Sequence, residues 1–277
     1  MKLVFSEYKS DYGNYIFPYA IWAIPEPHEM PAMIFDRGFL PAARDFSQFY
    51  MCRHVRVVLG KFEPSSENRR IMRKCEDIEY TLVPRSKFDF THGWRDFCKN
   101  YADIKFGKDV MTHARLDSLF ESAIISHVLV FTDTATGRDI GIATLYVEGA
   151  ELAYFYYSFY DLNYYIRNLG MYIMMSAVHT FAQQGTRFMY LGTCYSRNAL
   201  YKTQFAGAEF FNGFRWSDDL KELKYLIGRD QGAVTKHLVE TEDFVEKFYS
   251  GRLESILQED SFVFPALGNT MRVDATS

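Results

Sequence analysis

The sequence predicts an α+β protein in which helices flank a mixed sheet, preceded by a smaller N-terminal accessory region. Three observations predict this class. Segments 123–131, 140–147 and 151–160 have strand character, and a polar turn separates the first two. The apolar run 171–182 is long enough for a mostly buried helix, and 188–193 returns to strand character. With 277 residues, 48% of them hydrophobic, the chain can bury one large core or two modest ones.

The N-terminal part of the chain is expected to form extended segments and one helix. Residues 1–50 are rich in tyrosine, phenylalanine and proline, and proline breaks regular helices. Segment 53–61 alternates apolar and polar residues as a strand does. After a turn, Ser65 or Ser66 can cap a charged helix that continues to about Ile78.

The remaining elements complete a second domain. Apolar spacing between residues 94 and 121 predicts helices at its edge. Beyond the central strands and helix, the sequence predicts a short helix, a strand and a terminal amphipathic helix, at 198–205, 208–216 and 241–258. We therefore divide the chain into an accessory region, residues 1–85, and a larger domain, residues 86–277.

The composition excludes several classes of protein. A net charge of −4 and a pI near 6.0 argue against DNA binding and against non-specific coating of RNA, so any nucleic-acid contact must be local. The four cysteines have no paired spacing and the seven histidines form no ligand-like pair, so we expect free thiols and no metal. Without a signal peptide or an apolar run of about 20 residues, the chain is expected to be cytoplasmic with no membrane partner.

Residues 167–172 form the most informative local motif. The run Arg-Asn-Leu-Gly-Met-Tyr keeps the arginine and the first glycine of the R-x-x-G-x-G/A loop of GNAT acyltransferases, in which a helix N-terminus holds the carrier. It therefore predicts a GNAT-like domain. Tyr172 replaces a small residue and is expected to crowd a pyrophosphate, which disfavours coenzyme A. The alternative is that Gly170 only turns a strand into a helix.

Further motifs follow one another in a fixed order. They are Arg37-Gly38-Phe39, the segment 62–70 (F-E-P-S-S-E-N-R-R), Tyr160-Asp161, Leu169-Gly170-x-Tyr172, Tyr190-Leu191-Gly192, and Tyr201-Lys202-x-x-Phe205 followed by Glu209. In this order and near this spacing they resemble the arginyl-tRNA–protein transferase family, from about Asp36 to Trp216. Several dispersed motifs in one order are more specific than any one of them.

The chain also departs from that family. The family's N-terminal cysteine cluster, associated with an iron–sulfur cluster, is absent, and residues 15–18 (Y-I-F-P) and a lone Cys52 stand in that region. Residues 40–43 replace the basic residues that follow R-G-F, and Leu162 and Gly207 replace two prolines. We therefore expect no cofactor, and either a divergent enzyme with a dedicated peptide acceptor or a relative without turnover.

The resemblance implies an aminoacyl-tRNA-dependent transferase whose co-substrate is charged tRNA. It would move an amino acid, with arginine as the first expectation, to an amine of a peptide or protein that carries Asp or Glu at the acceptor site. Charged tRNA and this acceptor are the expected partners. Two alternatives are an acyl-CoA-dependent GNAT N-acetyltransferase and a non-catalytic relative that binds tRNA or peptide.

Three residues are candidates for catalytic roles. Asp161 can accept the amine proton, bind an arginyl guanidinium or only cap a turn. Tyr201 can stack on adenine or donate to an oxyanion, and Lys202 can neutralise a phosphate or bind an acidic acceptor side chain. The candidate substrate-binding residues are Tyr160, Arg167, Leu169, Gly170, Tyr172, Tyr190, Gly192 and Glu209. The alternatives are core packing for the tyrosines and an ion pair with Lys202 for Glu209.

A basic stretch between residues 53 and 74 is the candidate tRNA-binding surface. It holds seven lysines and arginines against two glutamates, in a chain that is net negative. Helical spacing puts most of its C-terminal cations on one side. The tRNA-binding candidates are Arg56, Arg69, Arg70, Arg73 and Lys74. The alternative is a solvated helix face.

Overall fold

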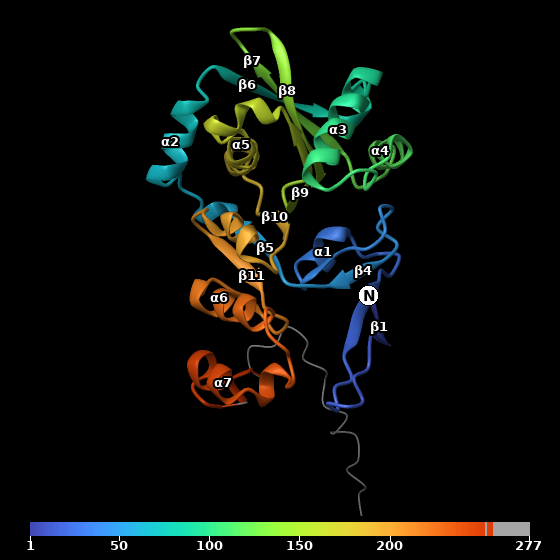
Figure 1. Ribbon diagram of the computed structural model, residues 1–277, viewed down its shortest axis with the longest axis vertical. Coiled ribbons are helices and arrows are strands. Elements are labelled where there is room, and N and C mark those ends of the chain that lie inside the picture. Colours follow the sequence, from blue (N-terminus) through green and yellow to red (C-terminus); the bar gives the residue numbers. More distant parts are fainter. Residues whose placement is uncertain (253, 257–277) are drawn as a thin grey trace, which may run out of the picture.

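A computed structural model describes residues 1–252 and 254–256 of the chain (Figure 1). Its centre is an eight-stranded sheet with the order β12-β11-β5-β10-β9-β8-β7-β6. The strands are β5 (His54–Val58), β6 (Ile78–Pro84), β7 (His127–Asp133), β8 (Arg138–Glu148), β9 (Leu152–Tyr160), β10 (Phe188–Thr193), β11 (Ala208–Phe211) and β12 (Trp216–Ser217). Neighbouring strands are antiparallel except for β9 and β10, which are parallel.

Helices cover both faces of this sheet. The helices are α1 (Pro31–Phe35), α2 (Ser66–Lys74), α3 (His92–Lys105), α4 (His113–Phe120), α5 (Leu169–Gln183), α6 (Leu220–Arg229) and α7 (Glu242–Tyr249), and the 3-10 turns are η1 (Leu59–Lys61), η2 (Arg85–Lys87), η3 (Leu162–Arg167), η4 (Arg197–Thr203) and η5 (Leu238–Glu240). Helices α2, α5, α6 and α7 share one hydrophobic core, and α1, α3 and α4 share the other. The predicted α+β class, a mixed sheet flanked by helices, is confirmed.

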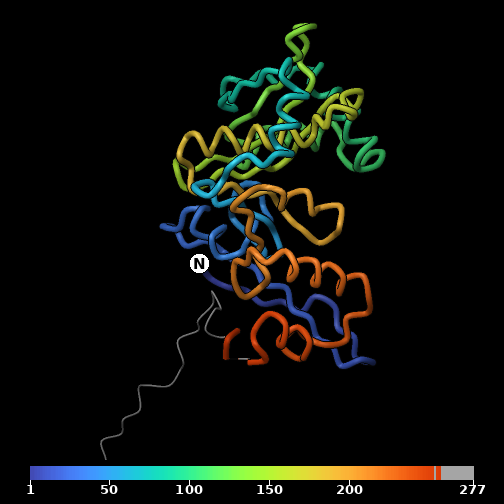
Figure 2. Tube along the Cα trace, turned by 90° about the vertical axis from the view of Figure 1, so that its left-hand side faces the viewer, coloured from blue at the N-terminus to red at the C-terminus, as the bar shows by residue number. Residues whose placement is uncertain are grey.

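A smaller antiparallel sheet at the N-terminus joins the second core. Its order is β1-β2-β4-β3, from β1 (Lys2–Glu7), β2 (Tyr19–Ile24), β3 (Phe39–Pro41) and β4 (Phe49–Met51). Both views place this sheet and the C-terminal helices at the opposite end of the molecule from β6, β7 and β8 (Figures 1 and 2). The smaller sheet ends at residue 51, whereas β5 and β6 lie within the large sheet, so a boundary at residue 85 does not separate the two sheets.

The two parallel strands diverge. Strand β10 pairs with β9 only from Phe188 to Tyr190, although β9 continues for six residues beyond Tyr154, the partner of Tyr190. Towards its end, β10 stays on β5 instead, with a register shift at Gly192, whose φ is +82°. Helix α5 connects the two strands, so its N-terminus lies where they separate.

Several predicted boundaries differ from the structure. Strand β6 was missed, and the predicted strand 208–216 is two strands joined by a turn, whereas the helices predicted between residues 94 and 121 are present as α3 and α4. The predicted short helix 198–205 is the 3-10 turn η4. The predicted terminal helix 241–258 corresponds to α7, which ends at Tyr249, and residues 257 and 258 lie outside the described residues.

Candidate active site

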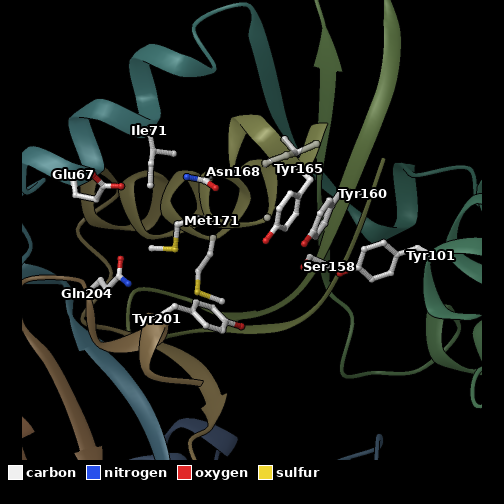
Figure 3. A pocket seen from close by; sticks show the side chains of 13 residues that line it. Glu67, Ile71, Tyr101, Ser158, Tyr160, Tyr165, Asn168, Met171, Tyr201 and Gln204 are labelled. Carbon is white, nitrogen blue, oxygen red and sulfur yellow. The ribbon is translucent and has the colours of Figure 1, made fainter. Parts of the chain in front are cut away.

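A cavity of about 430 Å³ lies where β9 and β10 diverge (Figure 3). Its walls come from α2, α3, the end of β9, the start of α5 and the η4 segment. The lining residues are Glu67, Ile71, Tyr101, Ser158, Tyr160, Tyr165, Asn168, Leu169, Gly170, Met171, Met174, Tyr201 and Gln204. The cavity therefore includes four of the predicted site residues: Tyr160, Leu169, Gly170 and Tyr201.

The N-terminus of α5 forms one wall of this cavity. Asn168 ends the η3 turn in the left-handed conformation, with φ 58° and ψ 39°, and its carbonyl accepts from the N–H groups of Met171 and Tyr172. Among the described residues, the N–H groups of Leu169 and Gly170 have no hydrogen-bond partner. Free N–H groups at the positive end of a 15-residue helix favour a negatively charged or polarised oxygen.

Gly170 allows a tyrosine to lie directly on the helix backbone. A Cβ atom at this position would lie 2.5 Å from the Tyr160 hydroxyl oxygen and 2.7 Å from the ring carbon that carries it. A side chain at residue 170 therefore requires Tyr160 to move. The glycine is needed for this contact and not for a left-handed backbone, since it lies inside the helix with no positive φ.

Hydroxyl groups gather at the other side of the cavity. The rings of Tyr101 and Tyr160 are 4.8 Å apart, and Ser158 lies two residues before Tyr160 on β9. Figure 3 shows the hydroxyls of Tyr160, Tyr165 and Tyr201 directed towards the space between them. Burial raises the pKa of both Tyr101 and Tyr201, so these phenols stay neutral and can act as hydrogen-bond donors.

Asp161 lies outside the cavity lining and has other partners. One of its carboxylate oxygens accepts from the Asn163 backbone N–H at 2.9 Å, which caps the η3 turn. The other oxygen accepts from Arg138 at 2.5 Å. The structure thus shows the turn-capping arrangement that the sequence offered as an alternative to a catalytic role.

Tyr172 and Tyr190 are core residues. The Tyr172 hydroxyl donates to the Ile78 carbonyl at 2.8 Å, and the ring packs beneath α5, away from the helix N-terminus. The expectation that Tyr172 would crowd a carrier at the loop is therefore wrong. Tyr190 is 1% exposed and its hydroxyl accepts from Arg56 at 3.4 Å. Neither lines the cavity, because both side chains point into the packed faces of their elements.

Arg167 connects α2 to the start of α5. Its guanidinium donates to the Lys74 carbonyl, at 2.7 and 3.0 Å, and pairs with Asp77. Side-chain hydrogen bonding to Asp77 raises the pKa of Arg167. The arginine of the loop motif therefore positions the loop instead of lining the cavity.

Arg56 and Glu209 pair with each other away from the cavity. The Arg56 guanidinium donates to Glu209 at 3.0 Å and to Asp36 at 2.6 Å, between the rings of Phe188 and Trp216. Arg56 is 7% exposed. The buried position of Arg56 differs from the surface position that was predicted for a tRNA contact. Glu209 pairs with Arg56, and not with Lys202 as the alternative for this residue had it.

The four cations predicted on α2 are exposed beside the cavity. Arg70 pairs with Glu67 at 2.5 Å, and Arg69 donates to the Pro64 carbonyl. Within the described residues, the side chains of Arg73 and Lys74 have no hydrogen-bond or ion-pair partner. Glu67 and Ile71 of the same helix line the cavity, so this basic face borders its entrance.

Nine lining residues were not predicted as site residues: Glu67, Ile71, Tyr101, Ser158, Tyr165, Asn168, Met171, Met174 and Gln204. Two of them carried a usable signal. Ser158 shares a strand face with Tyr160, and Met174 is one helical turn from Gly170. Tyr101 comes from α3, about 60 residues earlier in the chain than Tyr160, and no local spacing could connect the two.

The described residues show neither a metal-binding cluster nor a membrane-spanning helix. No group of three or more histidine, cysteine, aspartate or glutamate residues there is arranged to hold a metal ion. None of the helices in residues 1–252 and 254–256 has the length and apolar character that crossing a membrane requires.

Comparison with known proteins finds distant relatives of one kind. An aspartate/glutamate leucyltransferase of Cereibacter sphaeroides is 26% identical over 178 residues, covering 60% of this chain and 62% of the relative. Those of Methylobacterium nodulans and Pseudomonas aeruginosa are 27% and 25% identical, covering 57% and 60% of this chain and 68% and 70% of the relatives. The chain thus spans about three fifths of the length of the first of these relatives. No model of a known protein family matches the chain.

Two solved structures are partly similar. The C-terminal domain of a candidate lysylphosphatidylglycerol synthetase from Agrobacterium fabrum has a TM-score of 0.42 at 14% identity, covering 52% of this chain and 46% of that one. FemX has a TM-score of 0.38 at 8% identity, covering 51% and 53%.

Proposed function

We propose that this chain, a divergent relative of the aspartate/glutamate leucyltransferases and through them of the arginyl-tRNA–protein transferase family, is an aminoacyl-tRNA-dependent transferase acting on Asp or Glu acceptors. One observation carries the proposal. The cavity between β9 and β10 joins the free N–H groups of Leu169 and Gly170 to the basic face of α2. The aminoacylated 3′ end of a tRNA can enter this cavity while the tRNA phosphates lie along the basic face of α2, which consists of Arg69, Arg70, Arg73 and Lys74. The predicted cytoplasmic location stays a prediction.

The cavity suits aminolysis of an ester that is already activated. The acceptor nitrogen attacks the ester carbonyl, a C–N bond forms, and the C–O bond to the tRNA ribose breaks. In this proposal the N–H groups of Leu169 and Gly170 and the neutral phenol of Tyr201, all at the cavity lining, donate to the developing oxyanion. The attacking nitrogen, cationic once the C–N bond has formed, loses a proton to water, and water returns one proton to the departing ribose oxygen, so the products are a neutral amide and a ribose hydroxyl.

The structure supplies no dedicated base at the cavity. Among the described lining residues, Glu67 is the one carboxylate, and it pairs with Arg70. An α-amine with a pKa near 8 is partly neutral at physiological pH, so water suffices as the proton acceptor. Positioning is then the main contribution of the protein.

The lining supports an apolar donor amino acid. Ile71, Met171 and Met174 line the wall beside α5, and a buried guanidinium would need a carboxylate that is not already paired. The related enzymes are named for leucine. We therefore propose leucine, or another apolar amino acid of similar size, in place of the arginine expected from the motifs.

The test is transfer from defined charged tRNAs. The protein is incubated with peptides that begin with Asp, Glu, Gln or Lys and with tRNA charged with leucine or arginine. We expect the Asp and Glu peptides to gain the mass of one leucine residue. If the protein binds tRNA but no amino acid reaches any peptide, it is a non-catalytic relative and the proposal is wrong.

Acyl-CoA-dependent acetyl transfer is the second candidate. It is favoured by the retained arginine and glycine of the loop and by the inward position of Tyr172, which leaves the loop open. A thermal-shift measurement separates the two candidates. Stabilisation by acetyl-CoA and not by leucyl-tRNA would favour the acetyltransferase.

A further inference from the structure

Lys202 is a half-buried cation without an anionic partner. It belongs to η4, and its ammonium donates to the Thr193 carbonyl at 2.8 Å. Among the described residues no carboxylate lies within ion-pair distance of it. Two of its three N–H donors thus have no hydrogen-bond acceptor among the described residues.

A lysine that is neither exposed nor paired with a carboxylate is unusual among the described residues, as a comparison with Lys99 shows. Of the lysines in the described residues, Lys99 and Lys202 are the two that are not exposed. Lys99 pairs with Asp103 at 2.5 Å on the same helix. Burying an ammonium is costly unless an anion compensates it, so Lys202 lacks the compensation that Lys99 has.

Lys202 is not a lining residue of the cavity, but its ammonium lies near the wall that Tyr201 forms. It is 6.0 Å from the centre of the Tyr201 ring, which lines the cavity. On its other side is Gly192, where a Cβ atom would lie 3.6 Å from the ammonium nitrogen. Gly192 marks the register shift of β10 near its divergence from β9, so Lys202 borders the opening between the two strands.

We propose that Lys202 binds the side-chain carboxylate of the acceptor's Asp or Glu, an inference that rests on the proposed transfer to such acceptors. In an N-terminal Asp or Glu the α-nitrogen and the side-chain carboxylate are roughly 4–6 Å apart by bond geometry. An amine placed beside the Tyr201 ring therefore puts its carboxylate within reach of the Lys202 ammonium. Lys202 is a specificity residue in this arrangement, because it contacts a part of the acceptor that does not react.

The alternative ligand is a phosphate of the tRNA 3′ end, which offers the same negative charge. The α2 surface already provides four exposed cations for phosphates, whereas Lys202 belongs to another element, η4, and is not exposed. The acceptor carboxylate therefore fits its position better.

The experiment compares Lys202→Met and Lys202→Arg with the wild-type protein on peptides that differ only in their first residue, Glu or Gln. We expect wild type and Lys202→Arg to prefer the Glu peptide. In Lys202→Met, kcat/KM for the Glu peptide should fall about 10- to 100-fold, the range for removal of a charged hydrogen bond, while that for the Gln peptide stays unchanged. Lys247→Met, which removes an exposed lysine of α7, is the matched control.

A charge reversal makes the test directional. Lys202→Glu should improve transfer to a peptide that begins with Lys relative to one that begins with Glu, because the sign of the preferred partner reverses. A merely structural role for Lys202 would not produce this change. Thermal melting of each variant checks that it is folded.

Three outcomes would overturn the inference. An equal loss on Glu and Gln peptides would assign Lys202 a structural role, and a rise in KM for charged tRNA alone would assign it to a phosphate. A wild-type protein that transfers leucine without distinguishing Glu from Gln would sink this inference only. Failure of the proposed function would give a different result from failure of the inference about Lys202, because no peptide would then be modified at all.

Discussion

At the scale of single residues, the cavity depends on one close approach between a ring and a helix. The Tyr160 hydroxyl occupies the space that any side chain at position 170 would need. This contact holds the end of β9 against the start of α5, and both elements line the cavity. Residue 170 therefore sets the distance between the N–H groups at the start of α5 and the hydroxyl of Tyr160.

We expect Gly170→Ala to lower both stability and activity. The added Cβ must displace Tyr160, and overpacking of this kind costs about 1–3 kcal/mol of unfolding free energy. Urea denaturation measures the loss of stability, and the rate of amino acid transfer measures the loss of activity.

Gly228→Ala is the matched control for this substitution. Gly228 is also a helical glycine without positive φ, but nothing lies within 4 Å of the position of its Cβ atom. Alanine there should stabilise the protein by roughly 0.5–1 kcal/mol, because glycine is the poorer helix former. If both variants behaved alike, the contact with Tyr160 would not be the reason for the glycine.

Sequence reasoning identified the residues at the loop better than those facing it. Gly170 and Tyr201 could be placed because a motif or a short spacing marks them. Tyr172 and Asp161 are close to these residues in sequence. However, the Tyr172 side chain points into the core, and the Asp161 carboxylate caps a turn. Which way a side chain points depends on packing, and the motif alone does not contain that information.

At the scale of elements, α2 is the basic border of the cavity. Its first turn is held by a capping box between Ser65 and Asn68, as the sequence predicted for a serine cap at this position. Its end is tied to α5 through Arg167, which contacts both the Lys74 carbonyl and Asp77. The helix therefore presents its exposed cations at a fixed place relative to the start of α5.

Removing cations from α2 should weaken tRNA binding without unfolding the protein. For Arg70→Ala and Arg73→Ala, we expect a lower affinity and a salt slope reduced by about one for each tRNA phosphate that the protein no longer neutralises. Fluorescence anisotropy with labelled tRNA over a range of salt concentrations measures both quantities. The melting temperature should not change, because both side chains are exposed.

Lys224→Ala on α6 is the control, since it removes an exposed lysine from another helix. An unchanged salt slope in the α2 variants would show that these cations only form a solvent-exposed helix face and do not contact tRNA. A large fall in melting temperature would show that they belong to a structural ion network.

Some elements could be predicted and others could not. Helix α5 and the strands before and after it were predicted because a long apolar run separates two strand-like segments. Strand β6 was missed because the predicted charged helix was extended to about Ile78, although apolar and polar residues alternate over residues 78–82 as they do in a strand. The turn that divides 208–216 was missed because aromatic residues continue through it.

At the scale of the whole molecule, the two halves of the sequence share one sheet. Strand β5 lies between β10 and β11, and β6 forms the opposite edge next to β7. Val55 and Val57 of β5 are fully buried in the core that α5 covers. The first 85 residues thus supply one inner strand and one edge strand of the large sheet as well as the smaller sheet.

We therefore expect residues 86–277 alone to lack a cooperative fold. Without β5, the edges of β10 and β11 lose their partner strand, and the core beneath α5 loses two valines. Co-expression with residues 1–85 should restore a soluble complex. Thermal unfolding followed by circular dichroism tests this, and a sharp transition of the isolated fragment near that of the full chain would contradict it.

The place of β5 also affects how the protein acquires its structure during synthesis. Arg56 on β5 and Tyr190 on β10 are 134 positions apart, so β5 leaves the ribosome long before the strands that will enclose it. Until then an apolar strand has two open edges, and translation at about 5–20 residues per second leaves them open for many seconds. The nascent chain is thus expected to depend on chaperones more than a protein with local strand pairing, and slowed synthesis should lower its yield.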